Sequence, residues 1–500
     1  MQCTAKNRVY RFNPIDTVIL FLPSAKPTEI LSSIPAELIF IKENANLSFF
    51  KGKQGEIAFF PFAQRPAVIL CGMGEPKETD VESLRRAGAA AASACRDKAV
   101  ETAHCIIPSV NGMEESAVLA ALTEGFFLAN YSFDRYKKKK EKEDNGKPLV
   151  RRLVAYTGVR DASLILNRIM TICRNTLLCR DLVNETSEQS DAEGIAREAS
   201  ALKRLPKVSC RVYGRRELEK MKMGLLLAVN RGSSRPPRLV VLTYLGAGRG
   251  KPSIALVGKG ITFDAGGMNL KPTGHIEDMR TDMAGAAAAL YAFKAAAELG
   301  LAKNIHAVLP LTENMLARDS YRPGDIYTAY NGMTVEIGNT DAEGRLILAD
   351  ALAYTEKSLK PAAIIDIATL TGACLVTFGE IVAGYVATDD SIASMLEEAS
   401  RATGEWIWRL PLLKDYEENV KSDIADVCNV SPEKNAGTIM GGMFLKQFIT
   451  NSAWAHIDIA GTARHSKPRG YRPKHATGFG VRLLVDAIER WQPSPGHPHV

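Results

Sequence analysis

The chain has 500 residues, of which 46% are hydrophobic and 24% charged, and its formal net charge is +7. This length exceeds what one hydrophobic core usually organises, so we expect two domains of ordinary globular composition. No apolar run approaches the roughly 18 residues that span a bilayer, which argues against a membrane protein, and the mild charge permits nucleic-acid binding without requiring it.

The cysteines and the N-terminal segment bear on the compartment. The nine cysteines are scattered and form no CxxC pair. This pattern favours reduced thiols in the cytoplasm over a disulfide framework or a cysteine–zinc site. The apolar stretch Thr17–Pro23 is shorter than the hydrophobic region of a signal peptide, and no small-residue cleavage pattern follows it. We therefore interpret it as a buried strand.

Residues 1–160 alternate short apolar runs with stretches of helical composition, which predicts an N-terminal α/β domain. The expected strands are Thr17–Leu22, Glu37–Ile41, Ile57–Phe62, Val68–Cys71, Cys105–Ile107 and Leu153–Tyr156, and the expected helices are Val81–Ala94 and Ser116–Asn130. The charge run Lys137–Lys147 is interpreted as a solvated loop and not as a nucleic-acid patch, because acids dilute its lysines and no aromatic residues interleave.

Residues 161–183 carry apolar side chains at helical spacing and predict a connecting helix. Residues 184–500 predict a second α/β domain, with a helix over Glu277–Glu298 and a hairpin around an Asn331-Gly332 turn. Its expected strands lie near Ser209–Tyr213, Leu239–Tyr244, Ile254–Val257, His306–Leu309, Ile364–Ile367 and His456–Ile459.

The densest cluster of chemically active residues is Gly338–Asp350 (GNTDAEGRLILAD). Asp341 and Glu343 follow an expected strand two residues apart, so an extended backbone would point both carboxylates the same way. Gly344 then allows the chain to turn before Arg345 and the helix that we expect to follow. Paired acids beside an arginine suit a divalent cation, although an acidic turn capping a helix is the alternative for this segment alone.

A second cluster, Leu256–Lys271 (LVGKGITFDAGGMNLK), places Lys259, Asp264 and Lys271 in an expected glycine-containing loop after an apolar strand. Ligands bind at such strand ends in open α/β sheets. A phosphate cradle is a weaker alternative, because neither GxxxxGK[ST] nor GxGxxG is present. Asp282 lies in the expected helix, and a surface carboxylate is the alternative for it, but the adjacent small residues Ala284–Ala289 indicate close packing that would not tolerate an unpaired carboxylate.

These motifs together resemble the leucine aminopeptidase family of cytosolic two-metal leucyl aminopeptidases. The resemblance covers nearly the whole chain and is strongest from about Leu182 onward. Its most specific element is TDAEGRL (Thr340–Leu346). The other matching segments are KGITFD (Lys259–Asp264), MRTDMAGAAA, PLTENM (Pro310–Met315), YRPGDI (Tyr321–Ile326), IDIATLTGA (Ile365–Ala373), WAHIDIAGTA (Trp454–Ala463) and ATGFGVRLL (Ala476–Leu484).

The resemblance implies an α/β fold in which a smaller N-terminal α/β domain is joined by a helix to a C-terminal catalytic domain (184–500) with a central mixed sheet flanked by helices. It also implies an enzyme that releases N-terminal amino acids from peptides with two divalent metal ions per subunit, Zn²⁺ or Mn²⁺, with Co²⁺ as a further option. The implied metal ligands are Lys259, Asp264, Asp282, Asp341 and Glu343, with Asp264 and Glu343 bridging both ions.

The resemblance assigns the remaining roles. Lys271 stabilises the oxyanion of the tetrahedral intermediate, and Arg345 holds a bicarbonate ion that moves the proton. The pocket for the first side chain is lined by Met279, Thr369, Gly372 and Ala476, and its apolar character favours Leu or Met. The implied assembly is a homohexamer whose active sites open into an enclosed cavity.

One departure from the family pattern lies beside a ligand, since Ala265 stands where a serine is usual. It leaves the predicted class unchanged, because the ligands are all present. Two other functions remain as alternatives. Some relatives also bind DNA, but no helix-turn-helix or continuous basic stripe is visible here. A non-catalytic structural relative is the other, and the intact Lys271, Arg345 and ligand set argue against it.

Overall fold

The structure is a computed structural model, and it describes residues 1–8, 10, 12–44, 47–138, 148–433 and 435–493. Most of the predicted charge run, residues 139–147, lies outside the described residues. The chain forms two compact units, residues 1–174 with 467–474, and residues 175–466 with 475–500. The division falls within α5 (Ala162–Asn184), at the position of the predicted connecting helix. The predicted boundaries at 160 and 184 therefore remain a prediction.

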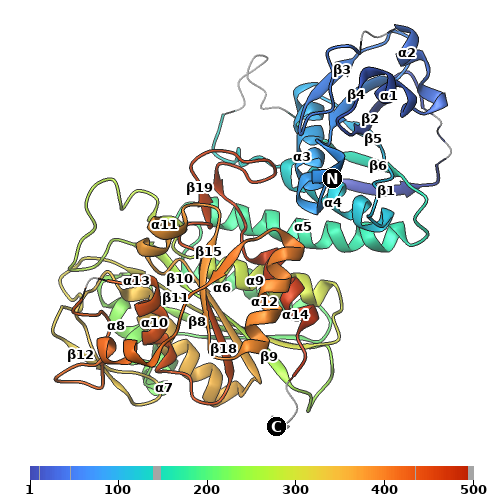
Figure 1. The fold of residues 1–500 in the computed structure, drawn as a ribbon. Coiled ribbons are helices and arrows are strands. Elements are labelled where there is room, and N and C mark those ends of the chain that lie inside the picture. The colour runs from blue at the N-terminus through green and yellow to red at the C-terminus, as the bar shows by residue number, and fades with distance from the viewer. Residues whose placement is uncertain (9, 11, 45–46, 139–147, 434, 494–500) are drawn as a thin grey trace. The chain divides into compact units, whose positions relative to one another are not determined.

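The first unit is a six-stranded sheet with strand order β1-β6-β5-β2-β4-β3 (Figure 1). All neighbouring strands are parallel except β3, which pairs antiparallel with β4. The strands are β1 (Gln2–Lys6), β2 (Thr17–Leu22), β3 (Ile57–Phe60), β4 (Ala67–Gly72), β5 (Thr102–Ile106) and β6 (Arg152–Tyr156), and the helices are α1 (Pro27–Ser32), η1 (Ala36–Leu38), α2 (Phe40–Asn44), η2 (Pro76–Glu78), α3 (Val81–Asp97) and α4 (Glu115–Ala129). All six residues of β2 are buried, which confirms the buried strand expected there.

One predicted strand of this unit is wrong. Residues Glu37–Ile41 lie in the short helices η1 and α2, with Ile39 as the one residue between them. The side chains of Leu38 and Ile41 are fully buried and lie three residues apart, which is helical spacing. The apolar side chains of this run are therefore buried by two short helices and not by a strand.

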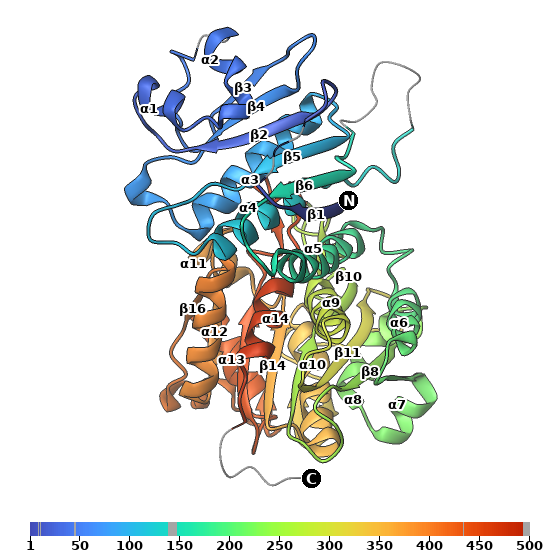
Figure 2. The same cartoon turned by 90° about the vertical axis from the view of Figure 1, so that its right-hand side faces the viewer.

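The second unit is built on a mixed sheet with strand order β16-β15-β18-β14-β9-β11-β8-β7, and β10 pairs with β11 (Figure 2). Its strands are β7 (Val208–Tyr213), β8 (Arg238–Leu245), β9 (Ser253–Gly258), β10 (Gly260–Asp264), β11 (Asn304–Asn314), β12 (Ile326–Thr328), β13 (Thr334–Glu336), β14 (Ala363–Ala368), β15 (Ala383–Ala387), β16 (Ile407–Arg409), β17 (Val427–Cys428), β18 (Ala453–Asp458), β19 (Arg464–His465) and β20 (His475–Ala476).

Helices cover both faces of this sheet, which confirms the expected architecture. Strands β9 and β14 are buried along their whole length, as continuous apolar runs in a covered sheet should be. The helices are α6 (Ala192–Ala201), η3 (Leu202–Arg204), α7 (Arg215–Met221), α8 (Gly224–Val229), η4 (Asn230–Gly232), η5 (Met279–Thr281), α9 (Ala284–Glu298), α10 (Glu343–Tyr354), η6 (Thr355–Leu359), α11 (Gly372–Phe378), α12 (Asp390–Thr403), η7 (Lys414–Val420), α13 (Gly437–Lys446) and α14 (Val481–Arg490).

Several local predictions for this unit need correction. The expected helix over Glu277–Glu298 begins only at Ala284, because η5 and the non-helical Asp282 and Met283 precede it. Residues Gly260–Asp264 form strand β10 and not a loop. The hairpin β12–β13 is present, but Ala329 and Met333 pair across a three-residue connection instead of a two-residue Asn-Gly turn. Within the described residues, no helix combines the length and apolar character needed to cross a membrane.

Candidate active site

The predicted site residues gather at the carboxyl ends of the parallel strands of the second unit. Lys259 follows β9, Asp264 ends β10, and Thr369 follows β14. Register pairing places the ends of β9, β11, β14 and β18 at one edge of the sheet. In open α/β sheets, ligands bind in the crevice outside the carboxyl ends of the strands, where the loops that follow the strands supply the side chains.

Lys259 is the centre of one half of the site. Its ammonium lies 2.7 Å from Asp282 Oδ2 and 3.0 Å from Glu343 Oε1, and it donates a 2.8 Å hydrogen bond to the carbonyl of Thr369. Burial alone would lower the pKa of Lys259, but the carboxylates of Asp282 and Glu343 outweigh it and raise that pKa. Thr369 also orients Asp282, since its hydroxyl donates to Asp282 Oδ1 at 2.6 Å.

Lys271 is the centre of the other half. Its ammonium lies 2.9 Å from Asp264 Oδ2 and 2.6 Å from Asp341 Oδ1. The second oxygen of Asp264 accepts hydrogen bonds from the amide of Asn314 at 2.8 Å and from the backbone N–H of Gly266 at 2.9 Å. Asp264 is thus fixed from three directions before any ion is considered.

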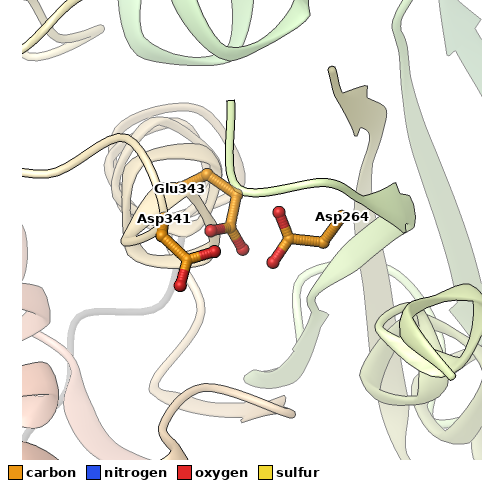
Figure 3. Close-up of side chains that lie close together, drawn as sticks. All are labelled: Asp264, Asp341 and Glu343. Carbon is orange, nitrogen blue, oxygen red and sulfur yellow. The ribbon is translucent and has the colours of Figure 1, made fainter. Parts of the chain in front are cut away.

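The carboxylates of Asp264, Asp341 and Glu343 face one another (Figure 3). One oxygen from each lies within 4.8 Å of the others. Burial raises the pKa of Asp264 and Asp282, and the charge on Glu343 raises both further, although the neighbouring lysines oppose this. Four carboxylates against two ammonium groups leave two negative charges uncompensated in a buried place, which is costly without further cations.

The donor set fits divalent metal ions. Among the described residues, none donates a hydrogen bond to the buried Glu343 Oε2. A buried carboxylate oxygen without a donor is rare in proteins, and metal coordination is one of the few arrangements that satisfy it. The oxygen-rich set with one lysine amine suits Zn²⁺, Mn²⁺ or Co²⁺ better than it suits a soft thiolate-seeking ion.

Arg345 lies close to this cluster, in the first turn of α10. Its Nη1 donates a 2.8 Å hydrogen bond to the carbonyl of Asn429, while its buried Nε has no hydrogen-bond acceptor in the part of the chain that the structure describes. Burial lowers the pKa of Arg345, and the carboxylates of Glu343 and Asp458 oppose that change. The guanidinium therefore keeps an unused donor beside the site.

Gly344 and Gly266 explain why the two motifs carry glycines. A Cβ on Gly344 would lie 2.4 Å from Cε and 2.6 Å from Nζ of Lys259, so glycine is needed for the lysine to approach α10, not for the turn that we predicted. Gly266 has a φ of +88°, and a Cβ there would lie 2.9 Å from Asp341 Oδ1. Both positions exclude a side chain from the space of the charged cluster.

The predicted extended backbone from Asp341 to Glu343 is wrong. Ala342 has φ −105° and ψ 44°, and Glu343 is already the first residue of α10. The two carboxylates meet because the chain turns into the helix between them. Asn429 fixes this turn, since its side chain accepts from the N–H of Gly338 at 2.8 Å and donates to the carbonyl of Asn339 at 2.7 Å.

A cavity of about 540 Å³ opens over the charged cluster, and we call it the active-site cavity. Among the residues predicted to bind substrate, Met279, Thr369 and Gly372 line it, together with Leu375. Ala476 does not line it and is fully buried in β20, where its N–H donates to Asn184 Oδ1 at 3.1 Å. The proposed pocket role of Ala476 therefore has no support in this geometry.

Comparison with known proteins agrees with the geometry. Residues 177–485 match the model of the cytosol aminopeptidase family catalytic domain, and residues 38–140 match the N-terminal domain model of the same family. The chain belongs to the cytosol aminopeptidase family. The predicted family and the enzyme class, an aminopeptidase, are thereby confirmed.

Individual relatives of this family are similar over most of the chain. A probable cytosol aminopeptidase of Protochlamydia amoebophila is 41% identical and covers 89% of this chain and 90% of its own length. One from Chlorobium limicola is 42% identical, with coverages of 88% and 90%. Among solved structures, the bottromycin maturation enzyme BotP in complex with Mn has a TM-score of 0.84 and 31% identity, and covers 95% of this chain and 99% of that one.

Three residues that hold the site were missed by sequence reasoning. Asn314 bonds Asp264 and also donates to the carbonyl of Thr340 at 3.0 Å. The Thr340 hydroxyl donates to the carbonyl of Gly266 at 2.7 Å and so ties the two motif loops together. A polar residue ending the apolar strand β11 was a usable signal for Asn314. No such signal marks Asn429, because it lies far along the chain from the turn that it holds. The structure shows that it is 0% exposed.

Proposed function

We propose that this aminopeptidase releases N-terminal residues from peptides through two divalent metal ions held by Lys259, Asp264, Asp282, Asp341 and Glu343. The proposal rests above all on one observation. Oxygens of three carboxylates lie within 4.8 Å of one another, and one buried oxygen, Glu343 Oε2, accepts no hydrogen bond from the described residues. Asp264 pairs with Lys271 but its charge also raises the pKa of Lys259, and Glu343 pairs with Lys259 but its charge also raises the pKa of Lys271, which supports their assignment as bridging ligands.

Divalent ions, when bound, supply Lewis acidity that acidifies water and polarises a carbonyl group. The chain's own residues do the rest. Lys271 lines the active-site cavity beside Asp264 and Asp341, so its ammonium is available to stabilise an oxyanion on a substrate. Lys259 is 3% exposed and enclosed by Asp282 and Glu343, and it would act as a ligand once bound divalent cations had lowered its pKa and released its proton.

Arg345 is proposed to hold a bicarbonate ion that accepts and returns the proton. Its buried Nε has no acceptor among the described residues, and an anion there would satisfy it. The carboxylates of the cluster are committed to the lysines and the proposed ions, so none is left as a general base.

The proposed preference is for Leu or Met at the first position. Met279 and Leu375 give the active-site cavity an apolar wall, and Gly372 leaves room beside them. An apolar wall of this kind distinguishes aliphatic from charged side chains more strongly than it distinguishes aliphatic side chains from each other.

We further propose a cytoplasmic homohexamer. Large apolar side chains are exposed on α11 and on the edge strand β16, including Val376 at 88% and Trp408 at 66%. Exposed apolar surface at a sheet edge is a common site of association, and closed symmetric assemblies are the usual outcome. The BotP relative, a complex with Mn, and the carboxylate-rich donor set support Mn²⁺ or Zn²⁺ as the ion.

The test is hydrolysis of a panel of aminoacyl amides after chelation and re-addition of Zn²⁺, Mn²⁺ or Co²⁺. We expect leucine and methionine amides to be cleaved fastest, and N-acetylated amides not at all. Metal-independent cleavage, or equal cleavage of acetylated and free amides, would contradict the proposal. A DNA-binding role is favoured by no described feature, and a gel shift at moderate salt would detect one.

A further inference from the structure

A second cavity lies in the same unit, at the ends of the sheet strands opposite to those that carry the candidate active site. It has a volume of about 880 Å³, and we call it the strand-start cavity. Ser253 and Asn304 begin β9 and β11 there, Ala362 and Ser452 precede β14 and β18, and Leu245 ends the antiparallel β8. None of the predicted site residues lines it.

The walls of this cavity are fixed by buried polar contacts. Asn304 is 2% exposed, and its amide donates to the carbonyls of Gly248 at 2.7 Å and Lys251 at 3.0 Å, which holds the loop after β8. On the other side, Glu356 accepts from the backbone N–H groups of Thr450, Asn451 and Ser452 at 2.8–3.1 Å. A cavity whose walls are held in this way is preformed, and a ligand would not have to order them.

The charge of the strand-start cavity is one-sided. Four exposed basic residues line it, and they are Arg249, Lys251, Lys357 and Lys360. The structure records no ion pair for any of these four among the described residues. Glu356, the single acid of the lining, already accepts its hydrogen bonds from Thr450–Ser452, as well as from the Thr450 hydroxyl at 2.6 Å. The lining thus carries four positive charges against the one negative charge of Glu356, and it presents a positive excess to solvent.

The deeper part of the lining is apolar. Phe448 is 2% exposed and Ala353 is 3% exposed, and the partly buried Leu245 and Leu359 join them. A ligand that suits this lining therefore needs an apolar body and an anionic group at the mouth. The volume is within the range of about 300–1,000 Å³ that small-molecule sites occupy.

We infer that the strand-start cavity binds a small organic anion, a carboxylate or a phosphate ester that carries an apolar or aromatic group. This inference is independent of the proposed metal centre, because the two sites share no residue and lie at opposite ends of the strands.

The test uses 8-anilinonaphthalene-1-sulfonate, an aromatic anion, as a fluorescent probe of the full-length protein. We expect saturable binding of one probe per subunit, displaced by phenyl phosphate if the natural group is a phosphate ester, or by phenylacetate if it is a carboxylate. The double charge reversal Lys251→Glu with Lys357→Glu should weaken binding about tenfold, the scale of two exposed charge interactions lost and reversed. Both positions are exposed, so the fold should tolerate the changes.

The matched control is Lys203→Glu with Lys220→Glu, which makes the same double charge reversal at two exposed lysines outside the cavity. It should leave the affinity unchanged. Three results would overturn the inference, namely no saturable binding, displacement by neither phenyl phosphate nor phenylacetate, or equal affinity in the cavity variant and in the Lys203 and Lys220 control.

Discussion

Asn314 offers a sharp test of how the metal centre is held, because it touches a proposed ligand without being one. Its amide donates to Asp264 Oδ1 at 2.8 Å and to the carbonyl of Thr340 at 3.0 Å, and the residue is 0% exposed. In Asn314→Ala both acceptors keep one other partner, the N–H of Gly266 and the hydroxyl of Tyr321. The lost bonds and the small void should lower the free energy of unfolding by about 2–4 kcal/mol.

The specific effect should be on metal affinity. Removing a group that orients a ligand typically costs about 10–100-fold in metal binding, which is about 1.4–2.8 kcal/mol. We would measure it by competition with a fluorescent chelator, alongside denaturant unfolding of the metal-free protein.

The matched control is Asn230→Ala. Asn230 is also 0% exposed and also donates two bonds, to the carbonyl of Arg235 and to the Thr312 hydroxyl, both at 2.9 Å, but it contacts no proposed ligand. Both variants should lose comparable stability, and only Asn314→Ala should lose metal affinity. An equal metal affinity in the two variants would refute the proposed positioning role.

Four further predictions follow from the same geometry. Asp264→Ala and Glu343→Ala should each lower metal content and abolish hydrolysis, and two full metal equivalents bound to either variant would refute the bridging assignment. Lys271→Ala should keep its metals and lose about 10²–10³-fold in kcat, the scale of one oxyanion donor. A fall in metal content in step with activity would contradict this role. Light scattering should give six times 54.4 kDa, and a fully active monomer would contradict the hexamer. Burial lowers the pKa of His306 to about 4, so the unfolded chain binds more protons than the folded chain between pH 6.5 and 4, and the free energy of unfolding falls as the pH falls. Over that window the wild type should lose about 3 kcal/mol more of that free energy than His306→Gln. Parallel pH profiles of the two proteins would contradict this prediction.

The sequence predicted those parts of the fold in which local pattern and burial agree. Strand β2 has five apolar residues after Thr17 and is buried throughout, and its predicted bounds match those observed. The run Glu37–Ile41 was misread because five residues are too few to distinguish the period of a strand from that of a helix. Only the structure shows that Leu38 and Ile41 face the same core. The helix before Ala284 was overextended because Asp282 turns out of it to meet Lys259 and Thr369.

The site likewise divides into residues that a local motif predicts and contacts that no local motif predicts. Lys259, Asp264, Asp341 and Glu343 could be predicted as site residues because each belongs to a short motif at a strand end or helix start. Several contacts that hold them join residues 50 to 110 positions apart, such as Asp264 with Asn314 and Lys259 with Thr369. Pairings of this kind depend on the sheet order, so no local pattern could have shown that Asn429 fixes the turn before Glu343.

The carboxylate cluster is proposed to hold two divalent ions, and anomalous diffraction from crystals grown with Mn²⁺ would locate them. We predict two anomalous peaks per subunit, both within coordination distance, about 2.0–2.2 Å, of carboxylate oxygens of Asp264 and Glu343. One of them should also lie beside Asp282 and Lys259, and the other beside Asp341. A single peak, or peaks that contact neither Asp264 nor Glu343, would contradict the account.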